Sequence, residues 1–364
     1  MSAAHPLRIA VIGAGAFGRN HLRVYQELAQ AGEAVKLVAV IDADARALAE
    51  ASAKFGIPGF ASVAECLVAV RVDAASVCVP TVFHRRVAEE LLAEGVDVLI
   101  EKPIAPSLED ADSILALAAR HGRIVQVGHL ERFNPAVTAA RRVLNRPMFF
   151  ESHRLSIFTP RSLDVDVVLD LMIHDLDIVL ALAQSPVREV RAVGLPVLSP
   201  RVDIANVRVE FESGCVANFT ASRVSTERVR KLRFFQPHQY LSIDFARQDL
   251  LMIDVTAAAG MDLKQLAAMA QLLQASQMPQ PLQTSQSSQL PATPGEHPSA
   301  GLSLKKIDVP QGEPLRLEIA AFLEAVRERT RPVVSGEDGR AALALALEIT
   351  SAIAAHAKRA GLEL

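Results

Sequence analysis

Leu7-Arg-Ile-Ala-Val-Ile-Gly-Ala-Gly-Ala-Phe-Gly18 joins a short apolar run to three regularly spaced glycines. The run at 7–12 predicts a buried parallel strand, and a helical pattern follows at about 17–31. Strand, glycine turn and helix in this order are typical of a dinucleotide-binding fold, because the N–H groups at the helix N-terminus can face the phosphates of the ligand.

The glycines have different expected roles. Gly13 allows the tight turn, Gly15 lets the backbone approach a pyrophosphate, and Gly18 lets the helix pack closely on the strand. Phe17 lies between the last two glycines and is also expected beside the cofactor. These four residues form the first part of a predicted cofactor site.

Asp42 follows the second apolar run, at 36–41. A carboxylate at this place can accept hydrogen bonds from both ribose hydroxyls of NAD, and it would repel the 2′-phosphate of NADP. Asp44 adds to the repulsion whereas Arg46 would favour a phosphate, so we predict NAD rather than NADP. Asp42 could instead cap the next helix, a role that Asp44 fills equally well.

Strands and helices alternate through the first 129 residues. Further apolar strands are expected at 74–79, 96–100 and 124–127, with helices between them at about 83–94 and 107–120. This alternation predicts a doubly wound parallel sheet with right-handed crossovers. Residues 1–129 are therefore interpreted as an NAD-binding Rossmann domain.

After His129 the pattern changes to recurrent strands with hairpin turns. We expect helices at 135–144, 167–183, 314–329 and 338–358, and strands at 148–158, 187–198, 204–211, 215–224, 229–235, 240–245, 250–255 and 302–309. Residues 130–364 are interpreted as an α+β domain with a large, mostly antiparallel open sheet. Within it, residues 257–300 are rich in Gln, Ser and Pro and predict a flexible low-complexity loop, with a short helix at 261–274.

The composition is that of a globular chain, with 50% hydrophobic residues and a formal net charge of -3. A charge this small gives no strong field for nucleic acid or an anionic membrane. Cys66, Cys78 and Cys215 are far apart and have no metal-ligand spacing, so we predict a reduced, cytoplasmic protein without a metal. The sequence shows no signal peptide, and its most apolar helices carry charges, so no membrane span is expected.

A second candidate site lies in Val98-Leu-Ile-Glu-Lys-Pro-Ile104, where an apolar strand ends in Glu101-Lys102-Pro103. Pro103 cannot donate a ladder hydrogen bond and so ends the strand. Lys102 is then placed at the carboxyl end of a central strand, where open α/β sheets bind ligands. The alternative for a single lysine is a surface position in the loop.

The apolar helix at 167–183 carries Asp170, His174 and Asp177, whose spacing of four and three residues predicts one shared face. A carboxylate beside a histidine fixes its tautomer and raises its basicity, as a general base requires. The alternative is a solvated helix face with one histidine. Apolar residues on the other faces disfavour that alternative, because they predict a helix buried on more than one side.

These motifs together, in this order, resemble the glucose–fructose oxidoreductase/inositol dehydrogenase (Gfo/Idh/MocA) family, over nearly the whole chain except the low-complexity loop. The resemblance implies oxidation of a sugar or polyol hydroxyl with NAD(P), and a second domain whose open sheet often forms oligomer contacts. It implies that His174 accepts the proton, oriented by Asp170, and that Lys102 contacts both nicotinamide ribose and substrate. The role of Asp177 stays open. Further cofactor contacts are implied for Pro80, Thr81, His84, Glu101 and His129.

A narrower resemblance rests on Gly128-His-Leu-Glu-Arg-Phe-Asn-Pro135 and Phe158-Thr-Pro-Arg161. These stretches look like the branch that oxidises the C3 hydroxyl of UDP-N-acetylglucosamine for lipid A or related envelope glycans. Arginines of the second domain could hold the diphosphate of such a substrate. Arg132 and Arg154 are favoured because they lie near the domain junction, whereas the basic run at 228–233 is equally consistent with an exposed hairpin.

Other functions stay open at this point. The chain could act on a free sugar, an inositol or a linear tetrapyrrole, or it could be a catalytically silent dinucleotide-binding regulator. A regulator would have no reason to keep Lys102, Asp170 and His174 together. We also predict a homodimer or homotetramer through an uncovered face of the second sheet. Its strands carry alternating residues that fit such a face, either Val207, Val209 and Phe211 or, on the opposite register, Val216, Asn218 and Thr220.

Overall fold

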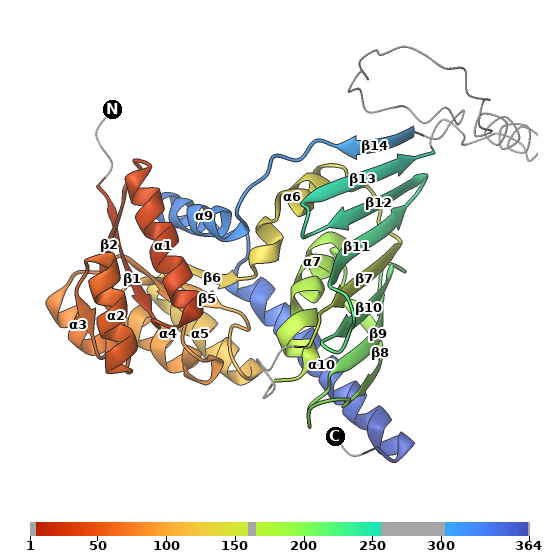
Figure 1. Ribbon diagram of the computed structural model, residues 1–364, viewed down its shortest axis with the longest axis horizontal. Helices are drawn as coiled ribbons and strands as arrows, with labels where there is room; N and C mark the ends of the chain where they lie inside the picture. The colour runs from red at the N-terminus through yellow and green to blue at the C-terminus, as the bar shows by residue number, and fades with distance from the viewer. Residues whose placement is uncertain (1–4, 159–164, 256–302, 363–364) are drawn as a thin grey trace, which may run out of the picture.

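The computed structural model describes residues 5–158, 165–255 and 303–362, which form two sheets flanked by helices (Figure 1). The first sheet is parallel, with the strand order β3-β2-β1-β4-β5-β6. Its elements are β1 (Leu7–Ile12), α1 (Ala16–Gln30), β2 (Val35–Ile41), α2 (Ala45–Phe55), β3 (Gly59–Phe60), α3 (Val63–Ala69), β4 (Ala74–Val77), α4 (His84–Ala93), β5 (Asp97–Glu101), α5 (Leu108–His121) and β6 (Val125–Gly128). The order reverses between β1 and β4, as in a Rossmann fold, so the predicted parallel sheet is confirmed.

The second sheet has eight strands in the order β14-β13-β12-β11-β7-β10-β9-β8. They are β7 (Phe149–Leu155), β8 (Val187–Leu195), β9 (Ile204–Phe211), β10 (Val216–Ser222), β11 (Val229–Gln236), β12 (Gln239–Asp244), β13 (Asp249–Asp254) and β14 (Ser303–Ile307). All neighbours are antiparallel except β7 and β10. The predicted large, mostly antiparallel open sheet is confirmed.

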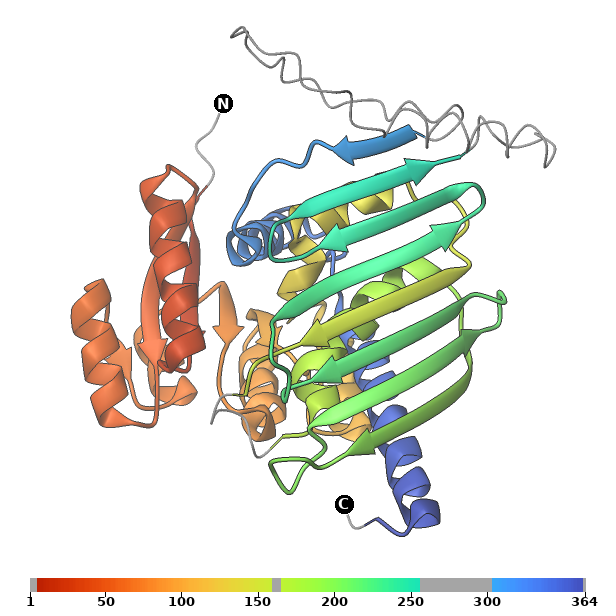
Figure 2. The same ribbon diagram turned by 45° about the vertical axis from the view of Figure 1, so that its right-hand side comes forward.

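Helices cover one face of this second sheet and leave the other open (Figures 1 and 2). They are α6 (Pro135–Arg142), α7 (Ile173–Ala183) and α10 (Gly336–Ala360). By length and composition alone, α10 could cross a membrane. Its buried residues instead pack against β8 and α7, as the core helix of a globular domain does.

The helix α9 (Pro314–Glu328) belongs in sequence to the second half but packs on the first sheet. Its apolar face, including Ile319 and Phe322, joins the core formed by Ile9 and Val11 of β1. The first sheet is therefore covered partly by a helix from the end of the chain, which ties the two halves together.

The helix expected at 167–183 is not uniform. A π-helical segment, η3 (Val168–Met172), precedes α7, and the Nζ atom of Lys102 donates a hydrogen bond to the carbonyl oxygen of Asp170 within it at 2.8 Å. Asp170 lies in this π segment beside Lys102, whereas Asp177 in α7 pairs with Arg132, so neither carboxylate pairs with His174 among the described residues. Periodicity of 3.6 residues could not reveal this segment.

The structure decides between the two registers expected for the open face of the second sheet. Val207, Val209 and Phe211 are fully buried against the helices, so that alternative is wrong, whereas Val216, Asn218 and Thr220 lie on the open face. Hydrogen-bonded polar pairs occupy much of the open face, such as Asn206 with Thr220 and Arg208 with Asn218. The loop expected at 257–300, its helix at 261–274 and Arg161 lie outside the described residues.

Candidate active site

The glycine turn has the geometry expected of a dinucleotide-binding loop. Gly13 has a φ of +101°, and a Cβ added there would lie 2.5 Å from the carbonyl oxygen of Cys78. A Cβ at Gly18 would lie 1.8 Å from the carbonyl oxygen of Gly13. Nothing lies within 4 Å of a Cβ added at Gly15. Of the three glycines of this turn, Gly15 is therefore the one that borders open space, which a ligand could enter.

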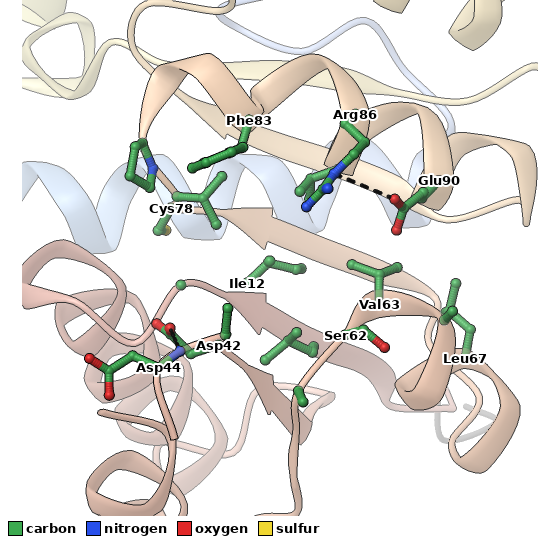
Figure 3. A pocket seen from close by; sticks show the side chains of 18 of the residues that line it. Ile12, Asp42, Asp44, Ser62, Val63, Leu67, Cys78, Phe83, Arg86 and Glu90 are labelled. Carbon is green, nitrogen blue, oxygen red and sulfur yellow. Dashed lines mark hydrogen bonds and ion pairs between the residues drawn. The ribbon is translucent and has the colours of Figure 1, made fainter. Parts of the chain in front are cut away.

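A pocket of about 1100 Å³ opens beside this turn, at the carboxyl ends of β1, β2 and β4 (Figure 3). Figure 3 shows Asp42 and Asp44 across the pocket from Phe83 and Arg86. The N-cap of α1, Gly15, has no side chain to satisfy the first N–H groups of the helix. A pocket of this size at a helix N-terminus and a topological switch point fits a dinucleotide.

Asp42 holds the glycine loop to the end of β2. Its two carboxylate oxygens accept hydrogen bonds from the backbone N–H of Ala14 at 2.6 Å and of Asp44 at 2.8 Å. Asp44 is the N-cap of α2 and accepts from the N–H groups of Arg46 and Ala47, so the capping role falls to Asp44. Each oxygen of Asp42 keeps a second lone pair for a ribose hydroxyl.

A second pocket of about 250 Å³ lies next to the first and is lined by residues of both domains. Both pockets are lined by Cys78, Val79 and Pro80. The second is also lined by Phe17, Thr81, His84, Glu101, Lys102, Leu130 and His174. The structure thus brings most of the predicted cofactor and catalytic residues to two adjacent pockets, called the groove below.

Lys102 reaches from the end of β5 toward the second domain. Its Nζ atom lies 3.8 Å from a carboxylate oxygen of Asp170, in addition to the bond to the Asp170 carbonyl. Its side chain is 20% exposed, and burial lowers the pKa of Lys102 below its ordinary value. The lysine is held in the groove by the π segment rather than extended into solvent.

His174 lies in the same groove without a carboxylate partner. Its Nδ1 atom is buried and has no hydrogen-bond partner among the described residues, and its ring meets the His129 ring edge-on with centroids 6.3 Å apart. Burial, followed by the charges of Lys102 and Arg154, lowers the pKa of His174 well below its ordinary value. The expectation that Asp170 pairs with His174 and raises its basicity is wrong in this structure, because Asp170 faces Lys102.

Three predicted site residues form local contacts, and a fourth, His129, does not. The ring nitrogens of His84 lie 3.0 Å from the carbonyl oxygen of Pro103 and 2.9 Å from that of Val79, which fastens the end of β4 to the turn after β5. Arg132 forms a buried bidentate pair with Asp177, and Arg154 does so with Asp175 and also bonds Glu131. Arg132 thereby links η2 (Leu130–Phe133) to α7, and Arg154 links β7 to α7. His129 is buried with neither ring nitrogen paired in the part of the chain that is described.

Sequence reasoning missed a buried polar chain behind Glu101. The carboxylate of Glu101 lies 3.0 Å from Nε2 of His21, whose Nδ1 lies 3.1 Å from the Ser76 hydroxyl, and Tyr25 reaches the same hydroxyl at 2.9 Å. The spacing Gly18-x-x-His21, one turn into α1, is the signal that could have found it. These contacts connect α1, which follows the glycine turn, to β4 and to Glu101 at the end of β5, next to Lys102.

One group within the described ranges brings possible metal ligands together: atoms of His21, Cys78 and Glu101 lie within 4.8 Å of one another. Burial raises the pKa of the Cys78 thiol well above its ordinary value. A metal ligand must be a thiolate, so this environment disfavours metal binding.

Comparisons with known proteins agree with this geometry. Residues 7–129 match the model of an oxidoreductase family with an NAD-binding Rossmann fold, and residues 137–236 match the Gfo/Idh/MocA C-terminal domain. The chain is 33% identical to the UDP-N-acetylglucosamine 3-dehydrogenase of Acidithiobacillus ferrooxidans over 97% of its own length and 99% of that protein. A solved structure of that enzyme superposes with a TM-score of 0.79 at 32% identity, covering 96% of this chain and 98% of that one.

Other relatives are more distant. The inositol 2-dehydrogenase of Leifsonia xyli is 29% identical and covers 52% of this chain and 57% of its own. A myo-inositol 2-dehydrogenase structure from Lactobacillus plantarum shares the fold, with a TM-score of 0.72 at 17% identity over 96% and 98% of the two chains. The two matched domains, the full-length relative and the lysine–histidine groove together show that the chain belongs to the Gfo/Idh/MocA family of oxidoreductases.

Proposed function

We propose that this oxidoreductase uses NAD to oxidise the C3 hydroxyl of UDP-N-acetylglucosamine to a 3-keto sugar nucleotide. The observation that carries the proposal is that Lys102 and His174 line a pocket that shares Cys78, Val79 and Pro80 with the pocket beside the glycine turn. The named activity of the full-length relative supports the choice of substrate. A role in lipid A synthesis rests only on the narrower sequence resemblance.

The chain's own residues supply positioning and proton transfer. Gly13, Gly15 and the first turn of α1 would hold the pyrophosphate of NAD, and Asp42 its ribose. When bound, NAD supplies the hydride acceptor. Proton transfer and stabilisation of the developing negative charge therefore depend on His174 and Lys102.

His174 accepts the proton of the substrate hydroxyl, because its depressed pKa keeps the imidazole neutral at ordinary pH. Lys102 stabilises the negative charge that develops on the same oxygen, since its ammonium is held in the groove by the carbonyl and the carboxylate of Asp170. Asp170 thus acts as a positioning residue for Lys102.

A substrate screen tests this proposal. We expect NADH formation with UDP-N-acetylglucosamine and none of comparable efficiency with free N-acetylglucosamine or myo-inositol. Preferred oxidation of inositol would replace the proposed substrate, and tight NAD binding without oxidation of any sugar or polyol would favour a silent regulator.

The charge at Asp42 gives a prediction about cofactor choice. NAD should bind more tightly than NADP in calorimetry, because the carboxylate repels a 2′-phosphate. Asp42→Ser should reduce the ratio of the NADP dissociation constant to the NAD dissociation constant by about tenfold or more. Asp42→Asn is the matched control for loop geometry, since its amide oxygen can still accept the bond from Ala14. Equal binding of both cofactors by the parent protein would contradict the prediction.

The open sheet face gives a prediction about assembly. Phe235 is 39% exposed there, and its ring packs between those of Phe149 and Tyr240 with centroids 5.6 and 5.0 Å away. We propose a homodimer or homotetramer through this face, because an aromatic row on an uncovered sheet favours an interface. Light scattering at micromolar concentration should show the oligomer and, for Phe235→Glu, a smaller species. A monomeric parent would refute it.

A further inference from the structure

Arg230 is a partly buried arginine without an acidic partner among the described residues. Its Nε atom is buried and has no hydrogen-bond partner there. In the β7–β11 ladder Arg230 lies opposite Arg154, and residues directly opposite in an antiparallel pair project to the same face. Leu232 and Phe234, on the same side of β11, are fully buried. The Arg230 side chain therefore points toward the helical layer that carries the active site.

The neighbouring carboxylates of Asp175 and Glu131 are already bonded to Arg154. Both oxygens of Asp175 accept from Arg154, and Glu131 accepts a further bond from it. Burial and the nearby charge of Arg154 lower the pKa of Arg230. A guanidinium in such a place is unfavourable unless an anion compensates it.

This unpaired charge lies within electrostatic reach of the proposed proton acceptor. Arg230 is among the groups whose positive charge lowers the pKa of His174. Arg230 lies on β11 of the second sheet, whereas Lys102 follows β5 of the first. A substrate bound between them would place its reacting hydroxyl near Lys102 and His174 and could extend an anionic group toward β11.

We propose that Arg230 binds the phosphate groups of a sugar-nucleotide substrate. A guanidinium offers up to five donors in a planar fork, which suits charge-assisted, bidentate contact with phosphate oxygens. The inference rests on the proposed function and moves the diphosphate contact away from Arg132 and Arg154, whose guanidinium groups are held by buried carboxylates. Arg230 would thus select phosphorylated sugars over free ones.

The test compares Arg230→Gln with Arg233→Gln in the full-length protein. Arg233 lies on the open face of the same strand and pairs with Glu151. Arg233→Gln therefore removes one charge from the same strand, on the opposite face from Arg230. For Arg230→Gln we expect roughly a 10- to 100-fold rise in the KM for UDP-N-acetylglucosamine and in the Kd of UDP measured by calorimetry. The Kd of NAD should stay the same, and Arg233→Gln should match the parent in all three measurements.

The possible results distinguish failure of this inference from failure of the proposed substrate. If the parent oxidises UDP-N-acetylglucosamine and Arg230→Gln keeps its KM and the Kd of UDP, the inference fails while the function stands. If the parent binds UDP through Arg230 but oxidises a different nucleotide sugar, the inference stands and the proposed substrate fails. A parent that neither binds UDP nor oxidises any UDP-sugar overturns both.

Discussion

His174→Ala is expected to lower kcat for UDP-N-acetylglucosamine oxidation by about 10²–10⁴-fold, the usual cost of removing a general base. The NAD dissociation constant should stay unchanged, because the proposed dinucleotide contacts all lie in the first domain. His153→Ala is the matched control, since His153 lies on β7 in alternation with the buried Ser152 and Arg154 and so faces the open side. Single-turnover NADH formation measures the effect without a contribution from product release.

The pH dependence adds a second readout. The imidazole must be neutral to accept a proton, so activity should fall as pH drops through the pKa of His174. Burial and nearby cations depress that pKa, so the acid limb should lie well below pH 6.5, the ordinary value for histidine. A variant His174→Ala that keeps the parental rate and the same acid limb would show that another group is the base.

Much of the fold follows from local sequence patterns. Apolar runs and glycine turns placed nearly every strand, because a strand buried in a sheet must be apolar along its length or on one side. The placement of α9 on the first sheet and the π segment before α7 did not follow. Both depend on contacts between residues far apart in the chain, such as Ile319 with the β1 core and Lys102 with the Asp170 carbonyl.

The sequence identified the residues of the candidate site, but it did not show which of them contact one another. Lys102 and His174 line one pocket, as their motifs indicated. Their contacts differed, because Asp170 can turn to either the lysine or the histidine and only the three-dimensional structure decides between them. The partners of the arginines could not be predicted for the same reason. The sequence could not show that Arg132 and Arg154 pair with buried carboxylates whereas Arg230 does not.

Lys102→Ala is expected to lower kcat by about 10²–10³-fold, the order found for removing one donor to a developing oxyanion. The KM for the sugar nucleotide should rise as well, because Lys102 also positions the substrate. Lys102→Arg should not restore activity, since the planar guanidinium cannot occupy the place that an ammonium fills between the Asp170 carbonyl and carboxylate. Arg120→Ala, on the last turn of α5, serves as a control for loss of a charge far from the groove.

The charge state of Lys102 makes this prediction sensitive to pH. Lys102 stabilises an alkoxide only as the ammonium, so the parental rate should fall as pH rises through its pKa, which burial places below the ordinary 10.5. Lys102→Ala should remove this basic limb, whereas His174→Ala should leave it in place. In the proposed mechanism both side chains act on one transition state, so the double variant should lose less than the product of the two single losses. Fully additive losses, or a basic limb that persists without Lys102, would show that the two residues serve separate steps.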